Sequence, residues 1–158
     1  MIPDASALLQ CGSIVPVADL MEVAKWASVQ YPKGLGPLDP VLAKHFNTPM
    51  EKLDFSAIAI EELVESINQR GLAQIVVVGI ETHICVLQTT LDLLASQIDV
   101  FVVADAVAAR GALDHQIAID RMQSEGAAIV TTEGVLFEWC RTATHPQFKM
   151  ISELVRKG

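Results

Sequence analysis

The chain has 158 residues, of which 51% are hydrophobic and 19% charged, and its mean hydropathy is +0.39. A chain of this length and composition can fold as a single domain, residues 1–158, without a disulfide or a metal to hold it together. Its formal charge of −8 disfavours nucleic acid as a partner, because phosphates carry the same sign. Its uninterrupted apolar runs are far shorter than the roughly 18 residues of a membrane span, so no membrane partner is expected.

From residue 59 onward, helical and strand periodicities alternate, which is typical of βαβ units. The chain is therefore predicted to be an α/β protein, with helices packed over a parallel sheet. Residues 31–37 are rich in turn formers and predict a surface loop. In chain order, the predicted elements are a helix at 17–24, a strand at 26–29, a helix at 58–70 ended by Gly71, a strand at 74–80, a helix at 82–97, a strand at 99–106, a helix at 113–124, a strand at 127–131, and helices at 132–141 and 146–157.

The cysteines indicate a reducing compartment. Cys11, Cys85 and Cys140 are odd in number, widely spaced and free of any CxxC pair, unlike a secreted disulfide framework or a zinc knuckle. No basic residue precedes Lys25, so the basic start of a secretory signal is absent. We expect a cytoplasmic protein.

The junction between the strand at 74–80 and the helix at 82–97 carries the most informative residues. Open α/β sheets bind ligands at the carboxyl ends of their strands, and Cys85 follows such an end. In the first turn of a helix, the positive end of the helix dipole favours the thiolate, so Cys85 is a candidate nucleophile. The alternative is a buried structural cysteine, which is the commoner role of an unpaired thiol.

Several motifs resemble those of the isochorismatase-like cysteine hydrolases, in particular the branch of small isochorismatase domains. The resemblance extends from about Gln30 to Lys157. In chain order the motifs are QYPKGLGP (30–37), KLDFSA (52–57), GIETHICV (79–86), QTTLDLL (88–94), VVADAVAAR (102–110), TEGVLFEW (132–139) and HPQFK (145–149).

This resemblance implies a hydrolase with an Asp, Lys and Cys triad, and an α/β fold with a three-layer, Rossmann-like parallel sheet and helices on both faces. It places the nucleophile at Cys85 and the lysine at Lys52, within a motif similar to the family's K-x-x-F-S-A. It also implies a cis peptide between Ile80 and Glu81, which directs the amides of Glu81 and Cys85 at the developing oxyanion. The site residues expected around the substrate are Glu81, Ile80, Phe55 and Gln30. Neither the Glu81 carboxylate nor the neighbouring imidazole is assigned a catalytic role.

No metal and no cofactor are expected. Nicotinamidase-type relatives hold a metal through an Asp-x-His element and further histidines, but the corresponding loop, residues 30–40, has no histidine. The four histidines of the chain are scattered, without ligand spacing. Gly34 and Gly36 are interpreted as turn glycines, and the turn after Gly79 lacks the further glycines of a dinucleotide-binding loop.

The start of the chain departs from the family pattern. The family's triad Asp ends an apolar first strand, and a long helix follows; here the strand and helix are shortened, and neither Asp4 nor Asp19 matches the motif. Two functions therefore stay open: hydrolysis of a small-molecule C–N or C–O bond through Cys85, or a catalytically silent binding or assembly subunit. We also expect a homo-oligomer, because the shortening would leave apolar surface to cover.

Overall fold

The computed structural model describes residues 29–30 and 50–156. The expectations for residues 1–28 and 31–49, including the helix at 17–24, the loop at 31–37 and the missing triad Asp, lie outside the described residues. The described elements are β1 (Val29–Gln30), β2 (Met50–Glu51), a 3₁₀ turn (Ala57–Ala59), α4 (Glu61–Arg70), β3 (Gln74–Ile80), a π-helical turn (Thr82–Val86), α5 (Leu87–Ala95), β4 (Asp99–Ala108), α6 (Ala112–Ser124), β5 (Ala128–Val130), α7 (Thr132–Cys140) and α8 (Phe148–Val155).

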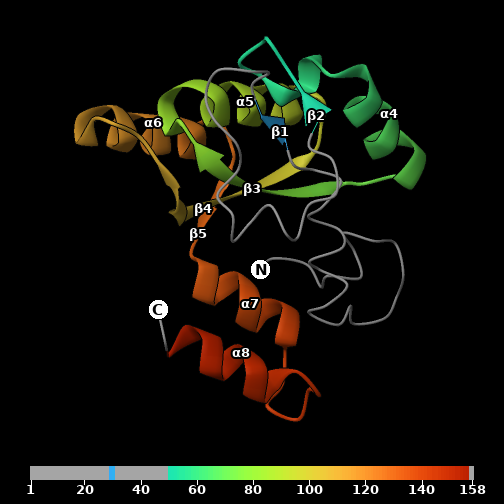
Figure 1. Cartoon of the computed structure of the whole chain (residues 1–158), viewed down its shortest axis with the longest axis vertical. Helices are drawn as coiled ribbons and strands as arrows, with labels where there is room; N and C mark the ends of the chain where they lie inside the picture. Colours follow the sequence, from blue (N-terminus) through green and yellow to red (C-terminus); the bar gives the residue numbers. More distant parts are fainter. Residues whose placement is uncertain (1–28, 31–49, 157–158) are drawn as a thin grey trace.

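The described strands form two sheets in which every pairing is parallel, as expected of an α/β fold (Figure 1). β3, β4 and β5 make a three-stranded sheet in that order, and β1 pairs with β2. β3 has the predicted bounds, and Gly71 ends α4 in the left-handed conformation at φ 60°. The pair β1 and β2 brings Gln30 opposite Glu51, the residue before Lys52.

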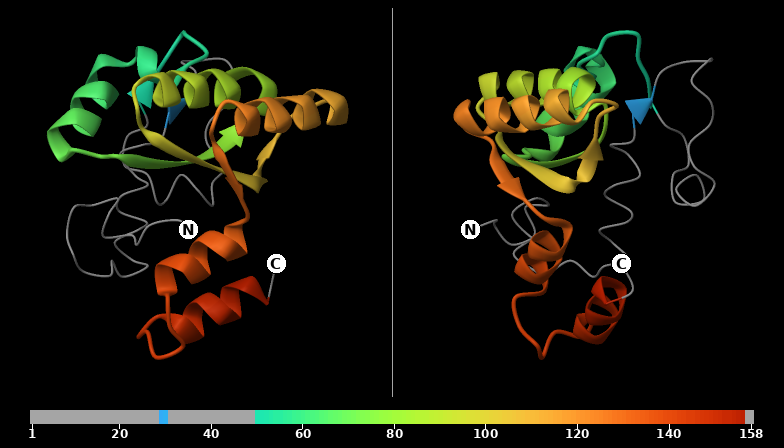
Figure 2. Two further views of the ribbon diagram at one scale, coloured as in Figure 1. Left: turned by 180° about the vertical axis from the view of Figure 1, so that it is seen from behind. Right: turned by 90° about the vertical axis from the view of Figure 1, so that its left-hand side faces the viewer.

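Strand β4 shows how the layers are built, because its four consecutive buried residues face alternate sides of the sheet. Val100 and Val102 pack in the larger core with α4, α5 and α6, whereas Phe101 and Val103 pack in a smaller cluster with Val135 of α7. Figures 1 and 2 show α4, α5 and α6 on one face, and α7 with α8 on the other. The predicted arrangement of helices on both faces is confirmed.

The sheet changes register just before the candidate site. Val77 pairs with Val102, but Gly79 pairs with Val107, so β4 contains three more residues than β3 between these two pairs. Gly79 has φ +122°, a conformation that other residues rarely adopt. The irregularity ends at Gly79, three residues before the turn that begins at Thr82. In the described part of the chain, no helix is both long and apolar enough to cross a membrane.

Candidate active site

Cys85 lies in the π-helical turn that joins β3 to α5. The Glu81 carbonyl accepts hydrogen bonds from the amides of Ile84, at 3.1 Å, and Val86, at 3.2 Å, and the second is the i→i+5 bond of a π-helix. The expected cis peptide between Ile80 and Glu81 is present. The Cys85 side chain is partly buried, and its turn continues directly into α5. The thiol thus belongs to the first turn of a helix at the carboxyl end of a strand.

Lys52 is a buried lysine with backbone partners. Its side chain is 9% exposed, and Nζ donates hydrogen bonds of 2.8 Å to the carbonyls of Asp54 and Phe55. These bonds fold the side chain back onto its own segment and fix the ammonium there. The Phe55 side chain, by contrast, is half exposed.

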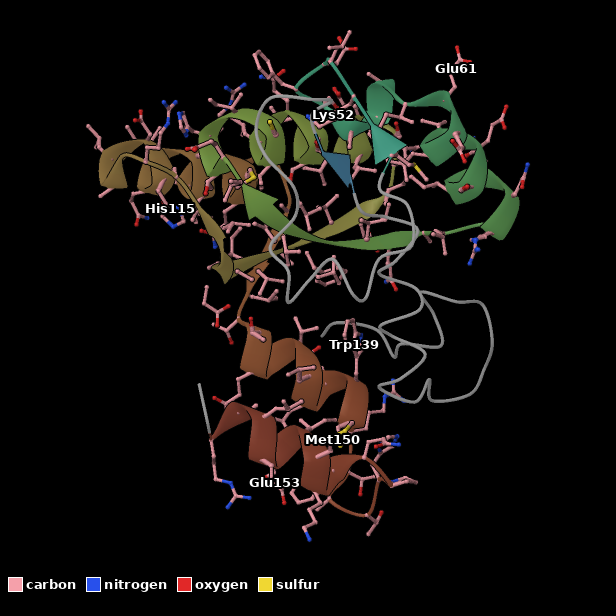
Figure 3. The ribbon with its side chains drawn as sticks, viewed as in Figure 1. Lys52, Glu61, His115, Trp139, Met150 and Glu153 are labelled. Carbon is pink, nitrogen blue, oxygen red and sulfur yellow. The ribbon has the colours of Figure 1, made fainter. Side chains whose placement is uncertain are left out.

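One hydrogen bond joins the Lys52 segment to the Cys85 helix. The Ala57 amide donates to Thr89 Oγ1 at 2.9 Å. Thr89 follows Cys85 by four residues, about one helical turn, so the two side chains share a side of the helix. Figure 3 shows Lys52 beside β2, on the face of the sheet that α5 covers. The structure therefore brings the segment of Lys52 and Phe55 to the helix side that carries the thiol.

The side chain of Glu81 has a role that sequence reasoning missed. Its carboxylate accepts a 3.0 Å hydrogen bond from the Arg110 amide and lies 3.5 Å from Arg110 Nε. His83 Nδ1 is 4.0 Å from the same carboxylate. The carboxylate thus joins the turn to the loop between β4 and α6. The available signal was the arginine that closes VVADAVAAR, which a parallel sheet brings to the same edge.

Helix α6 makes a second contact with this turn. Thr82 is fully buried, and its Oγ1 is 3.0 Å from Nδ1 of His115. Among residues 50–156, no group of three or more His, Cys, Asp or Glu side chains is arranged to hold a metal ion.

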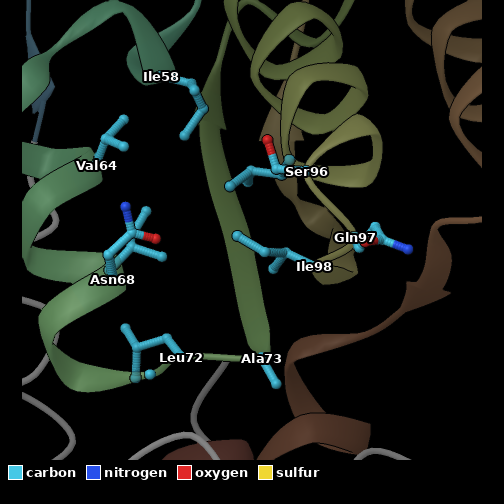
Figure 4. Close-up of a pocket in the computed structure, with 11 residues that line it drawn as sticks. Ile58, Val64, Asn68, Leu72, Ala73, Ser96, Gln97 and Ile98 are labelled. Carbon is cyan, nitrogen blue, oxygen red and sulfur yellow. The ribbon is translucent and has the colours of Figure 1, made fainter.

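A cleft of about 340 Å³ lies at the other end of the sheet (Figure 4). It is lined by α4, the end of α5 and the residues that precede β3 and β4, including Leu72, Ala73 and Ile98. Because β3 and β4 are parallel, these residues mark the amino ends of the strands, whereas Cys85 follows a carboxyl end. The cleft is separate from the candidate active site.

Comparison with known proteins identifies the family. The isochorismatase domain model matches residues 24–134. The chain belongs to the isochorismatase domain family. It is 39% identical over 145 residues to isochorismatase domain-containing protein 2 of Bos taurus, covering 91% of this chain and 70% of that protein.

Solved structures agree with this assignment. A structure named MAR1 ribonuclease from Caenorhabditis elegans has a TM-score of 0.75 and 34% identity, and the match covers 88% of this chain and 76% of that one. YcaC of Escherichia coli, described as an octameric hydrolase of unknown specificity, has a TM-score of 0.70 and 25% identity over 98% of this chain and 90% of its own. The predicted superfamily is therefore confirmed, together with the α/β fold.

Proposed function

We propose that this isochorismatase-family domain, a single unit over residues 1–158, is a cysteine-dependent hydrolase of small molecules with a C–N or C–O bond. The observation that carries the proposal is the hydrogen bond between Ala57 and Thr89, which fastens the Lys52 segment to the side of the helix that bears Cys85. Family membership supports hydrolysis as the class of reaction.

The proposed chemistry begins at the Cys85 sulfur. The thiolate adds to a carbonyl carbon or an equivalent electrophilic carbon, and the bond to the leaving nitrogen or oxygen then breaks. The leaving group takes up a proton, and water hydrolyses the covalent adduct, which restores the thiol. The amides of Glu81 and Cys85 are the proposed donors to the oxyanion, and such a donor contributes about 3 kcal/mol to stabilising the transition state.

Lys52 is proposed to stabilise the thiolate by its positive charge. A nearby cation favours the anionic form of an acid. Its hydrogen bonds to two backbone carbonyls restrict the position of the ammonium. Ile80, Phe55 and Gln30 are proposed to contact the substrate, and the half-exposed ring of Phe55 is suited to cover an apolar group.

The experiment is labelling with iodoacetamide at neutral pH, followed by peptide mass spectrometry. The protein carries Cys11→Ser, so that Cys140, which is 1% exposed, serves as an internal reference. We expect Cys85 to be alkylated faster than a free peptide thiol. A Cys85 rate no higher than that of the peptide would contradict an activated nucleophile.

A screen of small amides and enol ethers then tests turnover. Activity should appear with the unaltered chain and disappear with Cys85→Ser. Activity that survives in this variant would rule out Cys85 as the nucleophile.

The second candidate is a catalytically silent binding or assembly subunit. It is favoured by the lack of a sequence match to the triad Asp, since loss of a positioned acid or base lowers rates by about 10²- to 10⁴-fold. Rapid alkylation of Cys85 without turnover of any amide or enol ether would support this candidate. In either case the protein is proposed to be cytoplasmic and homo-oligomeric.

A further inference from the structure

Two residues just before Cys85 are held by the β4–α6 unit. Thr82 begins the π-helical turn and bonds to His115, which Figure 3 shows on α6. Glu81, one residue earlier, accepts the Arg110 amide through its carboxylate. The turn that carries the thiol is therefore tied to a different element from the Lys52 segment, which is tied to α5.

The hydrogen bond between Thr82 and His115 matters because the Thr82 hydroxyl is buried. At 0% exposure, the Thr82 hydroxyl has no contact with bulk water, so His115 supplies the hydrogen bond that solvent cannot. Thr90, further along the same continuous helix, is also 0% exposed, yet its Oγ1 has no hydrogen-bond partner among the described residues. A buried threonine in this helix can thus lack a hydrogen-bond partner, so the bond from Thr82 to His115 is a specific feature of the turn.

We propose that His115 is a positioning residue: through its hydrogen bond to Thr82, it sets the orientation of the turn that carries Cys85. The inference rests on the proposed function, since it concerns the turn that carries the proposed nucleophile. Thr82 and Cys85 lie in one five-residue turn closed by the bond from Val86 to the Glu81 carbonyl. A shift of Thr82 toward or away from α6 therefore moves the thiol relative to Lys52.

The test uses the full chain with Cys11→Ser and measures the rate of Cys85 alkylation by iodoacetamide. Thr82→Val removes the hydroxyl at nearly constant shape, and Thr90→Val makes the same change at the threonine without a partner. A displacement of about 1 Å can slow a reaction about 100-fold, so we expect Thr82→Val to slow alkylation about 10-fold. Thr90→Val should react at the wild-type rate.

Rescue separates positioning from simple packing. Thr82→Ser keeps the hydroxyl and should restore the rate. His115→Asn places a polar atom near the Nδ1 position and should also retain the rate, whereas His115→Leu should slow it as Thr82→Val does. His115 is only partly buried, so its variants keep the test open if Thr82→Val does not fold.

The outcomes separate the two proposals. If wild-type Cys85 reacts no faster than a peptide thiol, the proposed function fails and this inference fails with it. If wild-type Cys85 is activated but folded Thr82→Val and His115→Leu react at the wild-type rate, the positioning role alone is overturned. Lower melting temperatures with unchanged alkylation would likewise assign the bond to stability only.

Discussion

The two described cysteines differ in surroundings more than their similar chemistry suggests. Cys140 is 1% exposed near the contact between α7 and α8, and its Sγ donates to the Thr142 carbonyl at 3.5 Å. Cys85 is partly buried, at a strand-to-helix junction held by two separate hydrogen bonds. The place of Cys85 after a strand made it a candidate nucleophile and the family motifs supported that role, but the residues that hold its turn are distant in sequence.

At the residue scale, Lys52→Met should slow Cys85 alkylation strongly. The change removes the charge and leaves the carbonyls of Asp54 and Phe55 without their donor. We expect a loss of about 1–2 kcal/mol in unfolding free energy, measured in urea. Turnover of a substrate from the screen should fall by about 100-fold or more, the range for loss of a group that stabilises charge at the reacting atoms.

The matched control is Lys149→Met, at an exposed position on α8. It should leave both alkylation and stability unchanged. Equal effects of the two substitutions would remove Lys52 from the proposed site.

Gly79→Ala tests the strand irregularity. An added Cβ would meet no atom within 4 Å, so the cost comes from φ +122° and not from a clash. Such backbone strain costs about 1–3 kcal/mol, which urea denaturation can measure. Gly126→Ala is the control, because Gly126 has φ +110° and equally open space around it. It should lower the free energy of unfolding by a similar amount and leave the rate of Cys85 alkylation at the wild-type value. Unchanged stability of both variants would contradict the assigned backbone cost.

At the element scale, two side chains, Thr131 and Asp105, cap the amino end of helix α7. Thr131 Oγ1 accepts from the Gly134 amide at 3.2 Å. Asp105 of β4 accepts from the Thr132 amide at 2.8 Å and from its hydroxyl at 3.1 Å. The strand that forms the centre of the described sheet therefore also anchors the helix on its second face.

Asp105→Ala should cost about 1–2 kcal/mol of stability, as expected for loss of a cap, with the effect read from urea denaturation. Asp120→Ala is the control, because the hydrogen bond that Asp120 accepts from Gln116 lies on the exposed surface of α6. That variant should stay within about 0.5 kcal/mol of the wild type. A stability loss no larger for Asp105→Ala than for Asp120→Ala would contradict the anchoring role.

Elements defined by local patterns could be predicted, whereas long-range contacts could not. The β-branched run gave β3 its bounds, and Gly71 marked the end of α4. β4 extends two residues past its predicted end, because Val107 and Ala108 pair with Gly79 and Ile80 after the register shift.

The predicted helix at 82–97 begins as a π-helical turn instead, which depends on one hydrogen bond to the Glu81 carbonyl. The two-residue strand β2 carries no periodicity and was missed.

For the site, the family motifs predicted the residues but not how they are held. The segment KLDFSA gave Lys52, and the structure adds its carbonyl partners and the bond to Thr89. The contacts of Glu81 with Arg110 and of Thr82 with His115 join residues about thirty positions apart. No local pattern encodes such pairs, because they arise only when strands β3 and β4 lie side by side.

At the scale of the whole molecule, exposed apolar side chains support the proposed homo-oligomer. Leu113 and Ile117 are 73% and 57% exposed on successive turns of α6, and Ile80 at the end of β3 is 69% exposed. Exposed apolar groups gathered on a surface favour association. Sedimentation at micromolar concentration should give a mass of at least two chains of 17.1 kDa. A species at the mass of one chain would contradict this expectation.

The π-helical turn also bears on how the chain tolerates changes of length. Its i→i+5 bond accommodates one residue more than an α-helical turn would. Deletion of one residue within 82–86 would therefore convert the turn to regular α-helical hydrogen bonding. Thr90 and Leu93 of α5 would still point toward the core. The same deletion within 87–95 would rotate every later side chain by about 100° and turn the buried face of the helix away from the core.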